Sequence, residues 1–250
     1  MLYNIYFSPT GGTKRAADCV AQAICDDCVT VDLIKNPNPE LRLSQKDLCL
    51  IAAPSFGGRV PAVCADLFSK ISGNGAKCVL LVVFGNRAVD DALAELSDIA
   101  EKGGFIVIAA IEAVAEHSLA RIYANGRPDT ADAEELTAFG KKIKSKFLSG
   151  DISAIAVPGA RPYKQAGTRP MDLVLRDTCI GCKTCVRECP VGAISPGNVS
   201  VYDKEKCFSC LHCVSVCPMK ARQNSSETTK MFEERLRERC TERKQNKLYI

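Results

Sequence analysis

The sequence predicts an α/β protein in which a doubly wound parallel sheet is followed by a small cysteine-rich module. Over residues 1–150, short apolar or β-branched runs alternate with amphipathic helical patterns. One cysteine spacing is then written twice, over residues 179–190 and 207–218. The chain has no apolar run of membrane-spanning length, so we expect no membrane insertion.

The alternation predicts five strands and four helices in the first 150 residues. The expected strands are Leu2–Phe7, Val29–Ile34, Leu48–Ala53, Cys78–Phe84 and Phe105–Ile111. The expected helices are Gly12–Cys25, Pro61–Ile71, Ala88–Lys102 and Thr130–Leu148. Strands joined by helical crossovers form a parallel sheet with helices on both faces.

Ligands of such sheets bind beyond the carboxyl ends of the strands, where the strand order reverses. Three loops are expected there: residues 8–13, 53–61 and 85–88. The first reads Ser-Pro-Thr-Gly-Gly-Thr and opens a helix, and such a loop can cradle an anion with its N–H groups. The alternative is a capped helix start with no ligand.

Eight of the fifteen cysteines follow the spacing C-x2-C-x2-C-x3-C-P, which is typical of [4Fe–4S] ligation in bacterial ferredoxins. In that arrangement the fourth cysteine of each run binds the other cluster. The spacing therefore predicts one cluster on Cys179, Cys182, Cys185 and Cys217, and a second on Cys207, Cys210, Cys213 and Cys189. A pair of structural zinc sites is the alternative.

The other seven cysteines are scattered, which favours a reducing, cytoplasmic compartment over a disulfide scaffold. Cys49, Cys64 and Cys78 fall in apolar runs and are expected in the core. The formal net charge is +4, but each oxidised cluster adds about −2. The apparent basicity therefore does not indicate nucleic-acid binding.

Two resemblances follow from these motifs. Residues 176–222 resemble a two-cluster bacterial ferredoxin domain of α+β type, in which short segments such as Val191-Gly-Ala-Ile194 follow the fourth cysteine. Residues 1–150 resemble a flavodoxin, which implies the strand order 2-1-3-4-5 and an FMN phosphate loop over residues 8–13. The combination is similar to the EFR1-type flavodoxin–ferredoxin fusions.

The flavodoxin resemblance implies that FMN binds at the three loops. The implied phosphate-binding residues are Ser8, Thr10, Gly11, Gly12 and Thr13. The implied residues around the flavin ring are Pro54, Ser55, Phe56, Gly57, Gly58, Gly85, Asn86 and Arg87. Arg87 stands where flavodoxins often carry an aromatic residue, so we expect it either near the flavin or paired with Asp90 or Asp91.

The two histidines leave alternatives open. His117 follows the fifth predicted strand, where it could relay a proton near the flavin or simply be solvated. His212 lies within the second cysteine run, where it could donate a hydrogen bond toward a cluster sulfur or have no such role.

The predicted organisation has four parts. Residues 1–150 form the flavodoxin-like domain and residues 176–222 the ferredoxin domain. Residues 151–175, with Arg169 and Pro170 among them, form an extended, semi-rigid connector. Residues 223–250 form a charged helical tail with a narrow apolar stripe, which either clamps the two domains or is a frayed, solvated helix.

These features predict an electron-transfer protein that relays electrons between two [4Fe–4S] clusters and FMN, converting one- and two-electron steps. The expected partners are ferredoxin- or flavin-linked donors or acceptors in an anaerobic or facultative cell. The alternative is a redox sensor or docking module whose flavodoxin fold binds no flavin. No residue indicates a substrate site or a catalytic group.

Overall fold

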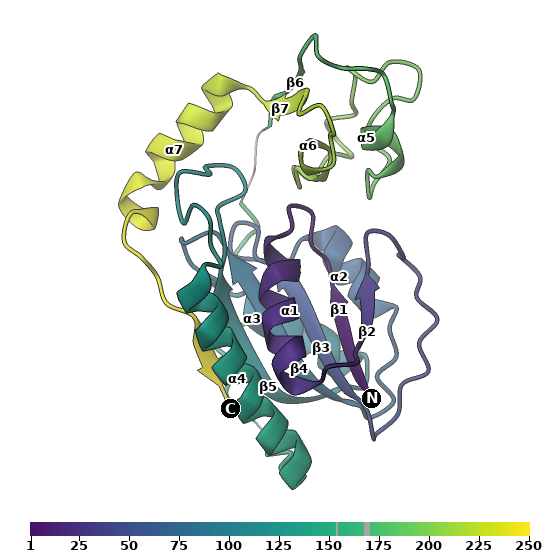
Figure 1. Cartoon of the computed structure of the whole chain (residues 1–250), viewed down its shortest axis with the longest axis vertical. Helices are drawn as coiled ribbons and strands as arrows, with labels where there is room; N and C mark the ends of the chain where they lie inside the picture. The colour runs from purple at the N-terminus through teal and green to yellow at the C-terminus, as the bar shows by residue number, and fades with distance from the viewer. Residues whose placement is uncertain (154, 168–170) are drawn as a thin grey trace.

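The computed structural model describes residues 1–153, 155–167 and 171–250. Within these residues the main sheet has the strand order β2-β1-β3-β4-β5-β8 (Figure 1). The first five strands in this order are parallel, and β8 is antiparallel to β5. The order 2-1-3-4-5 that the flavodoxin resemblance implies is confirmed. The edge strand β8 was not expected, because it comes from the tail.

The predicted strands and helices all form, with ends that differ by a few residues. The strands are β1 (Leu2–Tyr6), β2 (Val29–Asp32), β3 (Leu48–Pro54), β4 (Lys77–Phe84) and β5 (Ile106–Val114). The helices are α1 (Gly12–Ile24), α2 (Ala62–Ser69), α3 (Ala92–Lys102) and α4 (Thr130–Ser149). Helix α3 begins later than predicted because Asp90 adopts a left-handed conformation with φ of 49°, which a helix cannot include.

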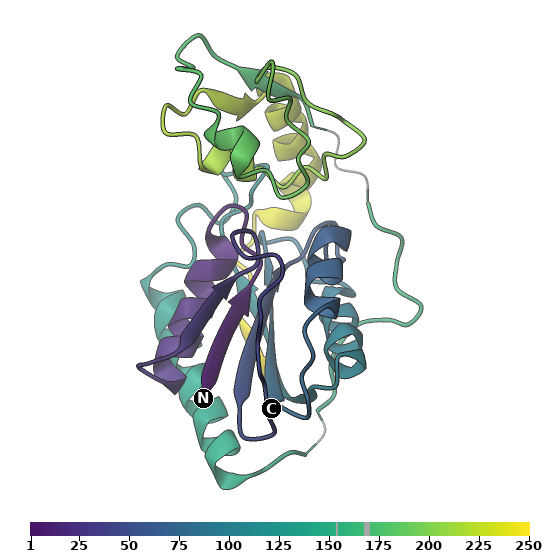
Figure 2. The ribbon, with the colours of Figure 1, turned by 90° about the vertical axis from the view of Figure 1, so that its right-hand side faces the viewer.

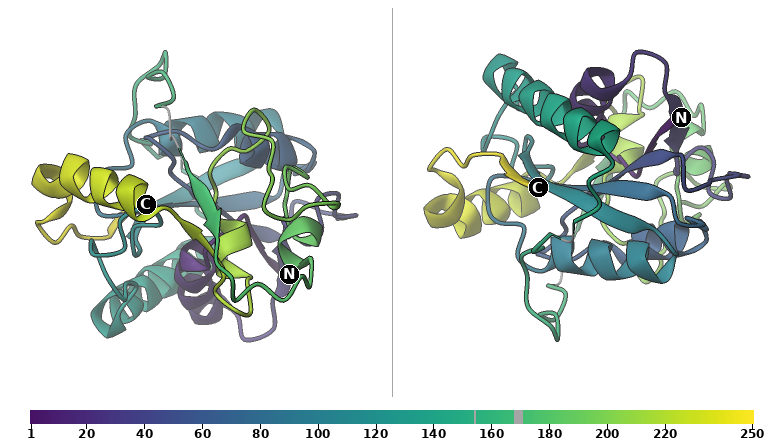
Figure 3. Two further views of the ribbon diagram at one scale, coloured as in Figure 1. Left: turned by 90° about the horizontal axis from the view of Figure 1, so that it is seen from above. Right: turned by 90° about the horizontal axis from the view of Figure 1, so that it is seen from below.

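The sheet is buried on both faces, as a parallel sheet must be (Figure 3). Along β3, Cys49 and Ile51 pack toward α2 and α3, whereas Leu48 and Leu50 pack toward α1 and α4. This alternation explains why the strand reads as one continuous apolar run. The three cysteines predicted to be core residues are fully buried: Cys49, Cys64 and Cys78.

The small module sits beyond the carboxyl ends of the parallel strands (Figure 2). It contains a two-stranded antiparallel sheet of β6 (Leu173–Leu175) and β7 (Arg222–Asn224) and two short helices, α5 (Thr184–Arg187) and α6 (His212–Ser215). The repeat in the sequence becomes a repeat in the structure. The fourth cysteine of each run accepts a backbone hydrogen bond from the residue four positions later, Ala193 to Cys189 at 3.3 Å and Ala221 to Cys217 at 3.2 Å.

The tail returns from the module to the sheet. Helix α7 (Ser226–Cys240) buries Phe232, Leu236 and Cys240, and β8 (Lys247–Tyr249) then pairs with β5. The helix is therefore packed and not frayed, and the module is tied to the sheet at both of its ends. Figure 1 shows α7 leading away from the module and the chain after it running down to the edge of the sheet.

The connector lies along the sheet domain. Asp91 accepts hydrogen bonds from the backbone N–H groups of Ala160 and Lys164, and Arg161 forms an ion pair with Asp98 at 2.6 Å. These contacts hold residues 160–164 of the connector against the sheet domain. Two connector residues singled out in the sequence, Arg169 and Pro170, lie outside the described residues.

Candidate functional site

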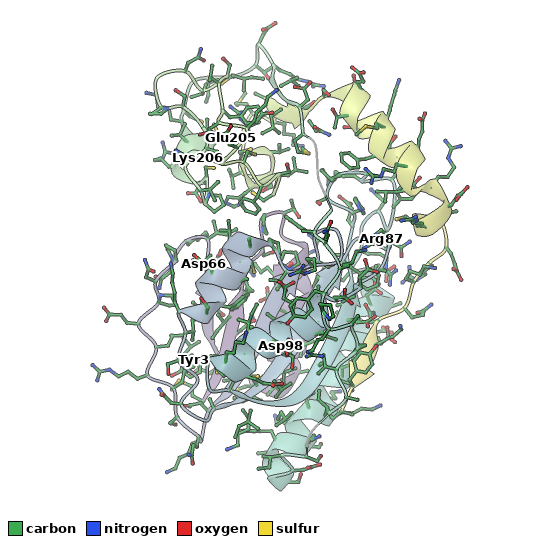
Figure 4. All side chains as sticks on the ribbon, turned by 180° about the vertical axis from the view of Figure 1, so that it is seen from behind. Tyr3, Asp66, Arg87, Asp98, Glu205 and Lys206 are labelled. Carbon is green, nitrogen blue, oxygen red and sulfur yellow. The ribbon has the colours of Figure 1, made fainter. Side chains whose placement is uncertain are left out.

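A cavity of about 330 Å³ opens at the carboxyl ends of β1, β3, β4 and β5. It spans the position between β1 and β3 where the strand order reverses, and ligands of doubly wound sheets bind there. Figure 4 shows Arg87 at the end of the sheet that faces the module. The predicted residues that line the cavity are Thr10, Gly12, Thr13, Pro54, Ser55, Phe56, Gly57, Gly85 and Arg87. The predicted residues outside its lining are Ser8, Gly11, Gly58 and Asn86.

The loop before α1 combines a capped helix start with a place for an anion. Ser8 Oγ accepts a hydrogen bond from the backbone N–H of Lys14 at 2.9 Å. Gly11 adopts φ of 84°, which glycine tolerates without strain. Within the described parts of the chain, the N–H groups of residues 10–13 find no acceptor. Free N–H groups at a helix N-terminus favour a bound anion, so the loop geometry favours the anion-binding alternative over a helix start without a ligand.

The loop after β3 turns sharply beside the cavity. Phe56 and Arg59 face each other across an isolated antiparallel bridge, and Gly57 and Gly58 between them adopt φ of 64° and 92°. A Cβ on Gly58 would lie 2.2 Å from Oδ2 of Asp90. Gly58 therefore lets the loops after β3 and β4 approach each other, and it supports the cavity without lining it.

The loop after β4 points its first two polar side chains in different directions. Arg87 lines the cavity and forms an ion pair with Asp90, which was one of the expected pairings. Asn86 is 2% exposed, and its Nδ2 donates hydrogen bonds to the carbonyl oxygens of Cys240 at 2.6 Å and Glu242 at 2.9 Å. In this chain Asn86 therefore anchors the tail.

His117 lies in the wall of the cavity and is fixed by its own loop. Its Nδ1 accepts hydrogen bonds from the backbone N–H groups of Leu119 at 3.2 Å and Ala120 at 3.1 Å. The neutral ring therefore carries its proton on Nε2. A Cβ on Gly85 would lie 2.5 Å from Cδ2 of His117, so this close approach requires glycine. His117 is an ordered wall residue, unlike the solvated loop histidine that was one alternative.

Two segments far away in the sequence complete the cavity. The connector contributes Lys164, Gln165 and Gly167, and α7 contributes Phe232, Arg235, Leu236 and Arg239. Sequence reasoning missed both segments as parts of the site. The spacing i, i+3, i+4, i+7 on α7 was the available signal, since it places these four side chains on one helix face.

The cavity wall carries more positive than negative charge. Asp90 forms ion pairs with both Lys164 and Arg87, and the Nζ of Lys164 lies 2.9 Å from its Oδ2. Burial acts to raise the pKa of Asp90, but the hydrogen bonds from both cations outweigh it and lower this pKa below its ordinary value. Within the described residues, Arg235 and Arg239 form no ion pair. The lining therefore suits an anionic ligand.

One group of cysteines, which we call the inner group, surrounds a second, smaller cavity within the module. It consists of Cys189, Cys207, Cys210 and Cys213, and Phe208 and Tyr202 line the same cavity. Burial raises the pKa of the Cys213 thiol to about 12, whereas the positive charge of Arg222 acts to lower it. Such thiols need a metal to deprotonate them at neutral pH, and a metal does so outright. These residues fit an iron–sulfur cluster.

The other four predicted ligands, which we call the outer group, are more accessible. They are Cys179, Cys182, Cys185 and Cys217. Cys182 is exposed and the other three are partly buried. A hydrogen bond with the Thr184 hydroxyl lowers the pKa of the Cys182 thiol, which favours the thiolate that binds metal.

The inner cysteine loop contacts the wall of the larger cavity. The ring centroid of Phe208 lies 6.2 Å from the ring centroid of Phe7 and 6.4 Å from that of Phe56. Phe56 lines the cavity. His212 Nδ1 lies 2.8 Å from the carbonyl oxygen of Pro9, and Ser215 Oγ donates to the same oxygen at 2.7 Å. Because a carbonyl only accepts, His212 donates from Nδ1. Its Nε2 is buried without a hydrogen-bond partner among the described residues and lies 3.6 Å from a carboxylate oxygen of Glu188. His212 therefore joins the module to the loop before α1.

Two features are absent from the described residues. No group of three or more histidine, cysteine, aspartate or glutamate side chains converges as the ligands of a single metal ion must. No helix among these residues has the length and apolar character needed to cross a membrane.

Comparison with known proteins identifies the module. Residues 178–221 match the sequence model of the 4Fe-4S dicluster domain, so they form an iron–sulfur domain of ferredoxin type. No curated protein matches the chain.

Solved structures that are similar to this chain include two flavodoxins and an oxidoreductase. A flavodoxin from the domain Archaea has 13% identity and a TM-score of 0.42, covering 59% of this chain and 99% of its own. A Streptococcus pneumonia TIGR4 flavodoxin has 18% identity and a TM-score of 0.42, and the match covers 58% of this chain and 99% of the flavodoxin. Rubredoxin oxygen:oxidoreductase from Desulfovibrio gigas has 14% identity and a TM-score of 0.42, and the match covers 61% of this chain and 37% of the oxidoreductase.

Proposed function

We propose that this chain is an electron-transfer protein that relays electrons between two [4Fe–4S] clusters and one FMN. The observation that carries the proposal is the contact between the two sites. Phe208, between two inner-group cysteines, packs against Phe56 in the cavity wall. A cluster and a flavin held at these sites would be separated by packed side chains within a single chain.

The inner group fits an arrangement in which the fourth cysteine of one run binds the cluster of the other run. Cys189 comes from the first cysteine run, yet it lines the same small cavity as Cys207, Cys210 and Cys213 from the second run. Cys189 and Cys217 accept equivalent backbone hydrogen bonds. This symmetry supports the same arrangement for the outer group, in which Cys217 of the second run would bind the cluster held by the cysteines of the first run. The proposal therefore keeps both predicted ligand sets.

The larger cavity has the features that FMN requires. Thr10, Gly12 and Thr13, with the free N–H groups of residues 10–13, would hold the phosphate. Phe56 and the neighbouring glycines offer a flat, close approach for the ring, and Arg87 offers a positive charge. When bound, FMN supplies exchange of either one or two electrons. His117, with its proton on Nε2, lies in the same wall and would act there as a proton donor.

The arrangement also supports an order for the relay. The inner group lies against the cavity wall, and the exposed Cys182 belongs to the outer group. Electrons would therefore pass between an external redox protein and the outer cluster, then the inner cluster, then the flavin. A cytoplasmic location, ferredoxin- or flavin-linked partners and membership of the EFR1-type fusions are parts of the same proposal.

The proposal is tested by the composition of the protein purified without oxygen. We expect about eight irons and eight acid-labile sulfides per chain, as two [4Fe–4S] clusters require, together with about one FMN. Full iron and sulfide with no flavin, even after FMN is added, would overturn the relay. That result would favour a redox sensor or docking module in which cluster state sets affinity for a partner.

A further inference from the structure

The loop before α1 is held by α6 of the iron–sulfur module, which lies beside it (Figure 1). His212, the first residue of α6, donates from Nδ1 to the carbonyl oxygen of Pro9 at 2.8 Å. Ser215, the last residue of α6, donates from Oγ to the same oxygen at 2.7 Å. Within the parts of the chain that the structure describes, this carbonyl accepts from no other group. The sheet domain therefore depends on the module to satisfy one carbonyl of this loop.

The contact at Pro9 is shielded from water. Pro9 is buried, and His212 is 8% exposed. A buried carbonyl that loses its donors is unfavourable, because water cannot replace them at once. We therefore expect the loop before α1 to change its conformation when both donors are removed.

Fixing the carbonyl of Pro9 also fixes the N–H of Thr10. The two groups belong to one trans peptide unit, which is planar, so they point in opposite directions. The N–H of Thr10 is among the free N–H groups of the loop, and Thr10 lines the cavity. The module thus sets the direction of a donor proposed for the FMN phosphate, although neither His212 nor Ser215 lines the cavity.

The two cysteine runs differ at the positions that make these contacts. Alignment of the runs on their cysteines places Thr184 opposite His212 and Arg187 opposite Ser215. Arg187 donates to the Thr184 hydroxyl at 3.2 Å and to the carbonyl of Cys182 at 2.9 Å, so it bonds within its own run. Among the described residues, only the second run donates to the loop before α1. This difference points to a role for His212 and Ser215 outside their own module.

We propose that His212 and Ser215 are positioning residues for the FMN phosphate, which act through Pro9 and hold the loop before α1 in the conformation that binds it. The inference rests on the proposed function for the presence of FMN. It deepens that function, because it makes flavin affinity a property of the iron–sulfur module as well as of the sheet domain. If the two side chains only held the domains together, their removal would weaken every ligand of the cavity alike.

The test compares the binding of FMN with that of riboflavin, which is FMN without its phosphate. It uses the full chain with its iron retained and its flavin removed, and fluorescence titrations give the two dissociation constants. The main variant, His212→Ala/Ser215→Ala, removes both donors. The rescue variant, His212→Asn/Ser215→Thr, keeps a donor at each position, since the asparagine Nδ2 takes the place of the histidine Nδ1. Arg187→Ala is the matched control, because it changes the position of the first run that is equivalent to Ser215.

In the double alanine variant we expect the dissociation constant of FMN to rise about tenfold or more, as the loss of two hydrogen bonds implies. The dissociation constant of riboflavin should stay within about twofold of wild type, because riboflavin has no phosphate to lose these contacts. The rescue and control variants should bind FMN within about threefold of wild type. Unchanged FMN affinity in the double alanine variant, or equal losses for FMN and riboflavin, would overturn the inference.

Two further measurements apply if the first comparison fails. If the double alanine variant loses iron, Ser215→Ala replaces it, since Ser215 is exposed, and an unchanged ratio of FMN to riboflavin affinity would then overturn the inference. If riboflavin binds too weakly to measure, the phosphorus resonance of bound FMN replaces it. We expect that resonance to shift while the flavin absorption band stays in place, and an unchanged resonance would overturn the inference. A wild-type chain that binds no FMN would instead contradict the proposed function.

Discussion

Replacing Cys189 with alanine is expected to remove the inner cluster and leave the outer one, although Cys189 belongs to the first cysteine run. Cys189 lines the inner cavity with Cys207, Cys210 and Cys213. Iron should fall from about eight to about four atoms per chain, as the loss of one [4Fe–4S] cluster requires. Iron analysis and the cluster resonance of the anaerobic protein measure this result.

The variant Cys217→Ala is the natural counterpart, because it should remove the outer cluster instead. Cys19→Ala is the control, since Cys19 is a partly buried cysteine of α1 in the sheet domain. The key observation is which resonance disappears. If Cys189→Ala lost the same resonance as Cys182→Ala, the clusters would not be ligated across the two runs.

Replacing Thr10 with glutamate is expected to abolish FMN binding at ordinary flavin concentrations. Thr10 lines the cavity beside the free N–H groups of the loop, and its side chain is exposed, so the change should leave the fold intact. The new carboxylate would face a phosphate of about −2 charge at short range. We expect FMN affinity to weaken about 100-fold or more, equivalent to about 2.8 kcal/mol. A fluorescence titration with FMN measures the dissociation constant.

The matched control for this variant is Thr130→Glu. Thr130 is an exposed threonine at the start of α4, so it receives the same charge at another helix N-terminus away from the cavity. FMN affinity should be unchanged in Thr130→Glu, and both variants should retain their iron. Wild-type affinity in Thr10→Glu would mean that the phosphate does not bind at the loop before α1.

The periodicity of the sequence was sufficient for the sheet and its five parallel strands. In β3, every residue from Leu48 to Pro54 is buried, and such a short continuous apolar run is typical of a strand covered on both faces. The cysteine spacing was equally informative, because the family match covers the same residues. Both signals are local, since the residues that carry them are close in the sequence.

The contacts of the tail could not be predicted in this way. Asn86 lies in a predicted flavin loop, yet its acceptors are Cys240 and Glu242, more than 150 residues away. The edge strand β8 has three residues, which is too short to show a period. It can pair with β5 only because α7 carries the chain back to that edge.

The positions of charged side chains at the two sites could also not be predicted from the sequence. Arg222 stands in the polar stretch Lys-Ala-Arg-Gln-Asn, where an arginine is ordinarily exposed. In the structure Arg222 is buried and begins β7, which pairs with β6. Likewise, Arg235 and Arg239 belong to the charged helical tail that was predicted over residues 223–250, and the sequence did not indicate that they form part of the cavity wall.

The central claim is that the clusters and the flavin exchange electrons within one chain. It is tested most directly by reducing the clusters with a rapid photochemical pulse and following the flavin absorbance afterwards. The account predicts first-order reduction of the flavin at a rate that does not change with protein concentration. A rate proportional to protein concentration would contradict it, because electrons would then pass between molecules and not through the contact at Phe208.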